Sequence, residues 1–308
     1  MNQEQTKGFL DQHPKLSYIC KNWQLYIIFM LPAFALTVIF KYLPMGGVLL
    51  AFENFNSRAG IFGSEFVGFA NFQRFLSSTD FWALMGNTLK LSANGLLWGF
   101  FPPVILALLL SRVARPKIRK KIQLIMYAPN FISTIVIAGM LFVFLSPVGP
   151  VNKMMGTSIN FMVSPEAFRT IYISSGIWQG AGWASIIYTA TLSNVSPELI
   201  DAAKIDGADL FQQIRNIDLP ALKPIMVIQF ILSAGQIMNI GFEKALALQT
   251  DINRVTSEII PTYVYKLGLQ IGDYGYSTAV GLFNSVINVI LLLTVNAIVK
   301  SLNDGEGL

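Results

Sequence analysis

The chain has 308 residues, of which 53% are hydrophobic and only 13% charged, with a net charge of +5. A soluble domain carries about a quarter charged residues, so the composition indicates a membrane protein with several spans. The basic residues collect in particular loops, as they do in membrane proteins, which argues against a nucleic-acid partner. A single cysteine, Cys20, excludes internal disulfides and cysteine-based metal sites, and a single His13 argues against a histidine metal site or proton relay.

The N-terminal segment, residues 1–23, is polar and is expected on the cytoplasmic side, with a short interfacial helix leading into the membrane. The first apolar run follows at about 24–42. Within it, Ala33-Phe34-Ala35 is a weak match to a signal-peptide cleavage site. The apolar run continues past this match to Phe40 and the leader is long, so we expect a retained span.

Five further apolar runs of roughly 20 residues follow, the length that a membrane-spanning helix needs. The loop at 111–121 carries six basic residues and no acidic one, which places it in the cytoplasm. The alternation of loops then predicts an all-α domain over 24–300 with six spans, both termini cytoplasmic, and a tail at 301–308. No internal repeat or clearly broken helix is evident. We expect spans at about 24–42, 87–110, 122–145, 170–192, 225–242 and 276–299.

The loop between the fourth and fifth spans, residues 196–224, contains charged residues of both signs and helix signals of its own. Ser196 and Pro197 suit the start of a helix, and Glu198 complements the dipole there. Gly207 suits its end. An ordinary helical hairpin loop remains an alternative, but mixed charge in a cytoplasmic loop indicates contact with another protein.

A second short helix is expected directly after this one. Asp209 and Gln212 have the spacing of a capping box, in which each side chain bonds the backbone N–H of the other residue. Proline lacks a backbone N–H, so we expect Leu219-Pro220 to end this helix.

Motifs for catalysis and nucleotide binding are not found in the sequence. It contains neither a phosphate-binding G-x-x-x-x-G-K-[ST] loop nor a G-x-G-x-x-G following a strand, so we do not expect the chain to bind a nucleotide. The only histidine lies in the N-terminal segment, so no Ser-His-Asp arrangement is available and no catalytic residue is assigned. No charged residue is expected in the middle of a span, which argues against an ion-driven carrier.

Neutral polar and aromatic side chains within the predicted spans form a second candidate site. Carboxamides can donate to and accept from hydroxyls, and indoles offer flat apolar faces, a combination that suits a sugar. For each residue alone, hydrogen bonding between helices is the more ordinary role; for the whole set, both interpretations stay open. The candidate substrate-pathway residues are Trp178, Gln179, Trp183, Gln236, Asn239, Asn284 and Asn288.

The charged loop resembles the signature loop of permease subunits of binding-protein-dependent ABC importers. That family's pattern is E-A-A, three residues, G, nine residues, and then I-x-L-P. Here Asp201-Ala202-Ala203 is followed by three residues and Gly207, then by nine residues and Ile217-Asp218-Leu219-Pro220. One departure is Asp201, where the family most often has Glu; the carboxylate is kept on a shorter stem.

Three segments outside this loop resemble the carbohydrate-uptake branch of the family. They lie at 67–72, 87–89 and 262–269. Within that branch the chain is most similar to the multiple-sugar permeases of the LplB kind, found mainly in Gram-positive bacteria. The likeness extends over nearly the whole chain from the first span onward.

The resemblance implies a type I ABC importer permease fold and a mechanism. In that family a short helix in the loop, here within 196–220, docks on a cytoplasmic ATPase dimer, whose ATP-driven closure rocks the spans. The implied partners are a second homologous permease, the ATPases and an extracytoplasmic sugar-binding protein. ATP and Mg²⁺ are expected on the ATPases, with no cofactor or metal on this chain. The implied ATPase-coupling residues are Glu198, Asp201, Ala202, Ala203, Asp206, Gly207, Leu219 and Pro220.

The expected function is therefore import of a sugar, an oligosaccharide or glycan fragment, across the plasma membrane of a Gram-positive bacterium by a subunit that is not itself an enzyme. Two alternatives stay open. One is a permease for another solute, such as a peptide or polyamine, against which the carbohydrate-like segments argue. The other is a stand-alone secondary carrier or channel, which uptake driven by a proton gradient without ATP would support.

Overall fold

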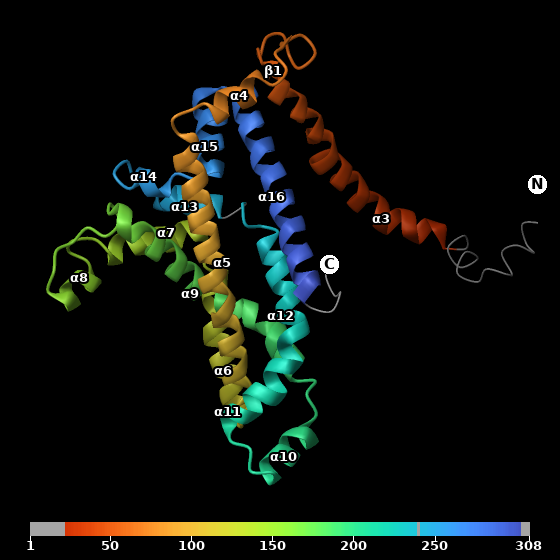
Figure 1. Cartoon of the computed structure of the whole chain (residues 1–308), viewed down its shortest axis with the longest axis vertical. Coiled ribbons are helices and arrows are strands. Elements are labelled where there is room, and N and C mark those ends of the chain that lie inside the picture. The colour runs from red at the N-terminus through yellow and green to blue at the C-terminus, as the bar shows by residue number, and fades with distance from the viewer. Residues whose placement is uncertain (1–21, 239–240, 303–308) are drawn as a thin grey trace, which may run out of the picture.

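The computed structural model describes residues 22–238 and 241–302. The described chain is almost entirely helical and elongated, with α5, α12 and α16 running along its length (Figure 1). The expected interfacial helix before residue 22, most of the expected tail, and Asn239 lie outside the described residues.

The described chain consists of two short strands and a series of long and short helices. Two short strands, β1 (Glu53–Asn54) and β2 (Glu65–Phe66), pair antiparallel with Glu53 opposite Phe66. The helices are α3 (Trp23–Thr37), the π-helix η1 (Val38–Tyr42), the 3₁₀-helix η2 (Leu43–Phe52), α4 (Ala70–Leu76), α5 (Phe81–Ser111), α6 (Pro116–Tyr127), the 3₁₀-helix η3 (Ala128–Phe131), α7 (Thr134–Phe144), α8 (Pro150–Met155), α9 (Pro165–Leu192), α10 (Pro197–Ile205), α11 (Leu210–Gln213), the π-helix η4 (Ile214–Asp218), α12 (Leu219–Ala234), α13 (Phe242–Leu248), α14 (Arg254–Ser257), α15 (Ile260–Tyr265), the π-helix η5 (Lys266–Ile271) and α16 (Tyr274–Leu302).

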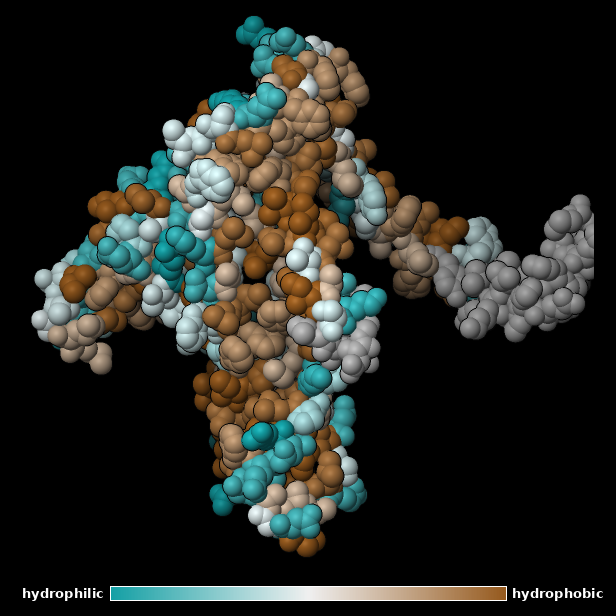
Figure 2. All heavy atoms as spheres, in the orientation of Figure 1, coloured by the Kyte–Doolittle hydropathy of each residue, from teal (hydrophilic) through white to brown (hydrophobic). Residues whose placement is uncertain are grey.

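Within the described residues, four helices are long and apolar enough to cross a membrane: Trp23–Phe52, Phe81–Ser111, Leu210–Ala234 and Tyr274–Ser301. A bent pair, α6–η3 with α7, would make a fifth. Apolar side chains cover much of the visible surface along the length of the molecule (Figure 2). The membrane class is thus supported, whereas the count of six spans and the cytoplasmic placement of both ends stay predictions.

The third predicted span, 122–145, is not one straight helix. Its two halves meet at 95° between Phe131 and Thr134. Pro129 lies in the 3₁₀ turn that ends the first half, and the Ser133 hydroxyl accepts a hydrogen bond from the Val136 N–H to begin the second. The expectation of no broken helix was therefore wrong.

The fifth predicted span, 225–242, begins and ends too late. The helix runs without interruption from Leu210 to Ala234 through the π-helical turn η4. Pro220 does not stop it, because this residue is second in α12 and the wider π turn precedes it. The expectation that Leu219-Pro220 ends the short helix was wrong, and the charged loop continues directly into a long apolar helix.

The helix α9 occupies the place of the predicted fourth span, 170–192, but is not among the four described helices that are both long and apolar enough to cross a membrane. It contains small and polar residues because it is an inner helix: its packing against α5 is the most extensive between any two elements. Close helix pairs in membranes favour such small residues. At the end of this pair that is nearer α10, Val104 and Ala107 of α5 pack with Tyr188 of α9 and Leu222 of α12.

Candidate functional site

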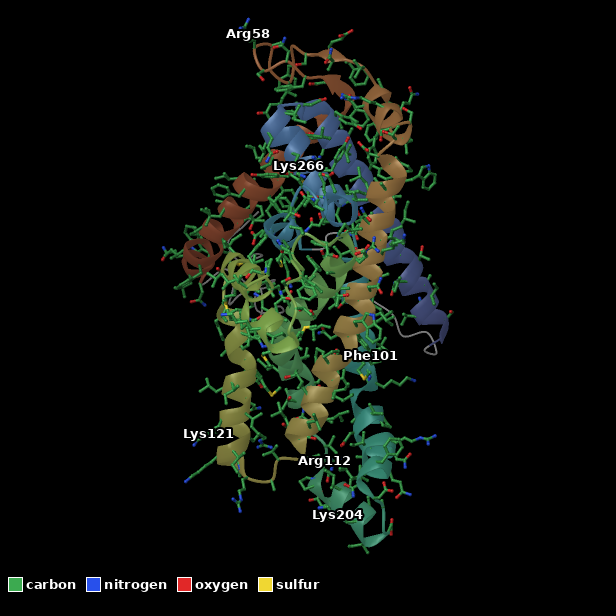
Figure 3. The ribbon with its side chains drawn as sticks, turned by 90° about the vertical axis from the view of Figure 1, so that its left-hand side faces the viewer. Arg58, Phe101, Arg112, Lys121, Lys204 and Lys266 are labelled. Atoms are coloured by element: carbon green, nitrogen blue, oxygen red, sulfur yellow. The ribbon has the colours of Figure 1, made fainter. Side chains whose placement is uncertain are left out.

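The predicted coupling loop lies at one end of the molecule. The helix α10 forms the tip of that end, and Lys204 lies there with Arg112 nearby, whereas Arg58 lies at the opposite end (Figures 1 and 3). Lys121, in the basic loop and helix that precede η3, lies toward the same end as Arg112. The labelled residues of the basic loop therefore lie toward the same end of the molecule as the predicted coupling loop.

No residue of α10 is buried. Ser196 precedes the helix as predicted, but its hydroxyl donates to the Glu198 carboxylate rather than accepting from the backbone. Asp201 and Lys204 form an exposed ion pair of 2.9 Å, which contributes little to stability. Ile205, the last residue of α10, is 87% exposed. The helix thus presents exposed polar side chains and an exposed isoleucine at this end of the molecule.

The backbone at Gly207 fixes the end of α10. Its φ of +78° lies in the left-handed region. The Gly207 N–H donates to the Lys204 carbonyl (3.1 Å) and the Ala208 N–H to the Ala203 carbonyl (2.8 Å), which together make a Schellman motif. A Cβ at position 207 would meet no atom within 4 Å, so glycine is required here by conformation rather than by space.

The predicted capping box is present directly after this turn. The Asp209 carboxylate accepts from the Gln212 N–H (2.7 Å), and the Gln212 side chain accepts from the Asp209 N–H (2.8 Å). Both predicted caps of the coupling loop, Gly207 and this box, are therefore confirmed. They hold the segment between α10 and α11 in one conformation.

A buried polar cluster that sequence reasoning missed joins this loop to the end of α5. The Arg112 guanidinium forms an ion pair with Asp218, whose side chain is only 4% exposed. Arg112 also donates to the Gln213 side chain (3.2 Å), and Gln213 donates to the Ala208 carbonyl (2.9 Å). Asp218 occupies the variable position of the I-x-L-P pattern. From the sequence, Arg112 is only one of the basic residues that predict a cytoplasmic loop.

A cavity of about 1020 Å³ lies between α5, α9 and α12. Glycines spaced by four residues leave room for it: Gly95 and Gly99 on α5, and Gly176 and Gly180 on α9. Residues four apart share one helix face, so each pair opens one side of the cavity. Most of the lining is apolar, and its polar or aromatic members include Ser92, Tyr172, Trp183, Tyr188, Gln229, Ser233 and Gln236.

Two of the predicted substrate-pathway residues, Trp183 and Gln236, line this cavity. The Trp183 ring also meets the Phe131 ring edge-on at 5.6 Å. Trp178 is 51% exposed and does not line it. The Gln179 amide donates to the Ile132 carbonyl (3.0 Å) beside the bend between η3 and α7.

The predicted pathway amides of α16 bind the backbone where α12 ends. Asn288 donates to the Gly235 carbonyl (2.7 Å) and accepts from the Met238 N–H (3.1 Å). Asn284 donates to the Met238 carbonyl (3.3 Å). These bonds satisfy backbone groups that the helix end would leave unpaired. Asn284 and Asn288 do not line the cavity.

Comparison with known proteins places the chain in a family. The family model "Binding-protein-dependent transport system inner membrane component" matches residues 99–304. The chain is 39% identical over 289 residues to the protein LplB of Bacillus subtilis, covering 92% of this chain and 90% of LplB. It is also 39% identical over 286 residues to the polygalacturonan/rhamnogalacturonan transport system permease protein YteP of the same organism, covering 91% of this chain and 89% of YteP.

A solved structure agrees with the sequence relatives. A chain of a bacterial ABC transporter involved in the import of the acidic polysaccharide alginate superposes with a TM-score of 0.85 and 36% identity, covering 94% of this chain and 99% of that one. The same transporter type has been solved in complex with an alginate pentasaccharide-bound periplasmic protein. With apolar helices long enough to cross a membrane, the chain is an integral membrane protein and belongs to the family of inner membrane components of binding-protein-dependent transport systems.

Proposed function

We propose that the chain is the permease subunit of an ATP-driven importer that carries an oligosaccharide or glycan fragment from an extracytoplasmic binding protein to the cytoplasm. The observation that carries the proposal is that the helices lining the cavity are connected directly to the exposed loop that contains α10. The cavity lies between α5, α9 and α12, while α10 lies at the tip, between α9 and α12 in the chain. Relatives named for oligosaccharide and polysaccharide transport support a sugar as the substrate.

In this proposal the loop at 196–220 receives force from a cytoplasmic ATPase dimer. The exposed α10, with Glu198, Asp201, Ala202 and Ala203, docks on the ATPase, and Asp206 and Gly207 hold its C-terminal turn. Leu219 and Pro220 continue the loop into α12, so a push on α10 reaches the cavity wall without a flexible joint. The chain itself has six spans with both termini inside, in the plasma membrane of a Gram-positive bacterium. It pairs with a second, homologous permease, so that the two chains share the pathway.

The substrate pathway is assigned to the cavity. Trp183 offers an apolar ring face, and Gln236 and Gln229 offer amides to sugar hydroxyls. Gln179, Asn284 and Asn288 act indirectly, by holding the bend before α7 and the end of α12 through the backbone bonds given above. Trp178 and Asn239 stay candidate pathway residues next to this region in sequence.

The test is the variant Ala203→Asp in the complete importer. A carboxylate on the docking helix should abolish sugar uptake and sugar-stimulated ATP hydrolysis, while the chain still reaches the membrane. The control is Ala59→Asp, an exposed residue at the opposite end of the molecule, which should leave both activities unchanged. Normal sugar-stimulated hydrolysis in Ala203→Asp would contradict the coupling role of the loop.

A further inference from the structure

Lys244 on α13 is a buried basic residue to which the proposed function assigns no role. The residue is 8% exposed, although its position in the sequence predicts an outer loop. Its ammonium nitrogen has no hydrogen-bond partner and forms no ion pair within the part of the chain that the structure describes. A buried charge without a counter-charge is costly, so a lysine with a purely structural role would be expected to have a carboxylate partner.

The ammonium group lies beside the wall of the cavity. It is 5.0 Å from the centroid of the Tyr172 ring, and a Cβ on Gly176 would lie 3.1 Å from its nitrogen. Both Tyr172 and Gly176 line the cavity. Lys244 does not itself line the cavity: its buried ammonium nitrogen lies beside Gly176, where α9 carries no side chain. The ring contact compensates for part of the lost hydration, but it supplies no negative charge.

A second orphan polar atom lies in the same region. The Ser92 hydroxyl lines the cavity and is buried without a hydrogen-bond partner. The preceding residue, Leu91, packs in one cluster with Tyr172 and with Ala245, the neighbour of Lys244. The cavity therefore has an unpaired hydroxyl in its lining and an unpaired ammonium group beside its wall. Buried groups of this kind concentrate at sites that bind a ligand.

We propose that Lys244 binds a carboxylate of the transported sugar, so that the importer takes acidic oligosaccharides built from uronic acids in preference to neutral ones. This inference rests on the proposed function and names its substrate class. An ammonium group and a carboxylate form a charge-assisted hydrogen bond, and the Ser92 hydroxyl in the cavity lining can bond a second oxygen of the same sugar. A neutral sugar would leave the cation unpaired at the moment when water is displaced from the cavity.

The experiment uses cells that lack this chain and are complemented with the wild type, Lys244→Met or Lys244→Arg, with all natural partner chains present. The probes are labelled trigalacturonate and tri-mannuronate, each beside its neutral methyl ester. Each comparison keeps the same binding protein, so a difference between variants reports on the permease. We expect Lys244→Met to lower the initial uptake rate of an acidic probe by roughly ten-fold, as for the loss of one charge-assisted hydrogen bond. Lys244→Arg should retain most of that rate.

Thermal unfolding of the purified importer separates binding from a structural role. Removal of an unpaired buried charge should leave the unfolding midpoint of Lys244→Met unchanged or higher. A lower midpoint, or equal losses for the acidic probe and its ester, would overturn the proposal. Uptake of the esters alone by the wild type, or acidic uptake insensitive to Lys244→Met, would overturn it while leaving sugar transport intact. Uptake of none of the four probes by the wild type would overturn the preference for uronic acids without contradicting transport of other oligosaccharides.

Discussion

The two sites of this permease are built in opposite ways. The loop around α10 is exposed, and its shape is fixed by local backbone bonds: a Schellman motif at Gly207 and a capping box at Asp209. The cavity is lined by three helices that are far apart in the sequence, and the Ser92 hydroxyl in its lining is buried without a partner. The first arrangement suits a rigid element on which another protein exerts force. The second suits a site in which a ligand supplies the missing hydrogen-bond partners.

The Arg112–Asp218 pair joins the end of α5, a helix that lines the cavity, to the loop after α10, and breaking it should have the largest effect. Arg112→Ala leaves the Asp218 carboxylate buried without a counter-charge, which should destabilise the protein by about 3 kcal/mol. The loss can be measured as a lower thermal unfolding midpoint of the purified importer, together with loss of uptake.

A matched double variant distinguishes a role of this ion pair in protein stability from a role in transmitting force. Arg112→Met combined with Asp218→Leu removes both charges and should recover most of the unfolding midpoint. If the pair transmits motion between α5 and the loop, uptake should stay low in this stable double variant. Wild-type uptake in the double variant would show that the pair serves folding alone.

A smaller effect is expected at Gly207, because only one residue must leave its preferred conformation. Gly207→Ala should cost about 1–2 kcal/mol of local stability, seen as faster hydrogen exchange at the Ala208 amide. Gly207→Asn should be milder, since asparagine tolerates the left-handed region. Gly139→Ala on α7, where a Cβ also meets no atom, provides the control and should leave exchange unchanged. Equal exchange in Gly207→Ala and the wild type would exclude a role for this turn in holding α10.

The smallest effects should come from single residues of the cavity wall. Trp183→Ala removes a lining ring and should lower the uptake rate several-fold, the scale of one stacking contact. Trp178→Ala, on the same helix but outside the lining, should change uptake less. A larger loss in Trp178→Ala than in Trp183→Ala would place the pathway elsewhere on α9.

The contrast between the two sites also explains what the sequence could predict. The caps at Gly207 and Asp209 depend on residues close together in the chain, so spacing alone predicts them, and both are confirmed. The Arg112–Asp218 pair joins residues 106 positions apart, which no local pattern reveals. The sequence places Lys244 in a predicted polar outer loop, because its burial depends on how α13 packs against α9 and not on any local pattern.

The amides of the predicted pathway show the same limit. An asparagine in an apolar helix indicates a hydrogen bond, but not whether the partner is a ligand or a neighbouring backbone. Asn288 bonds both an N–H and a carbonyl at the end of α12, an end that the sequence places too late. Because the break falls at Gly235–Met238 and not after Phe242, the α16 amides are engaged by the backbone there.

The central claim is that α10 contacts a cytoplasmic ATPase, and cross-linking tests it directly. Because Cys20 is the only cysteine, Cys20→Ser gives a background in which one new thiol reacts alone. In the complete importer, Ala202→Cys should cross-link to the ATPase subunit with a short bifunctional reagent and lose uptake on doing so. Ala59→Cys at the opposite end should not cross-link to it. A cross-link to the ATPase from Ala59→Cys, or none from Ala202→Cys in an assembled importer, would contradict the account.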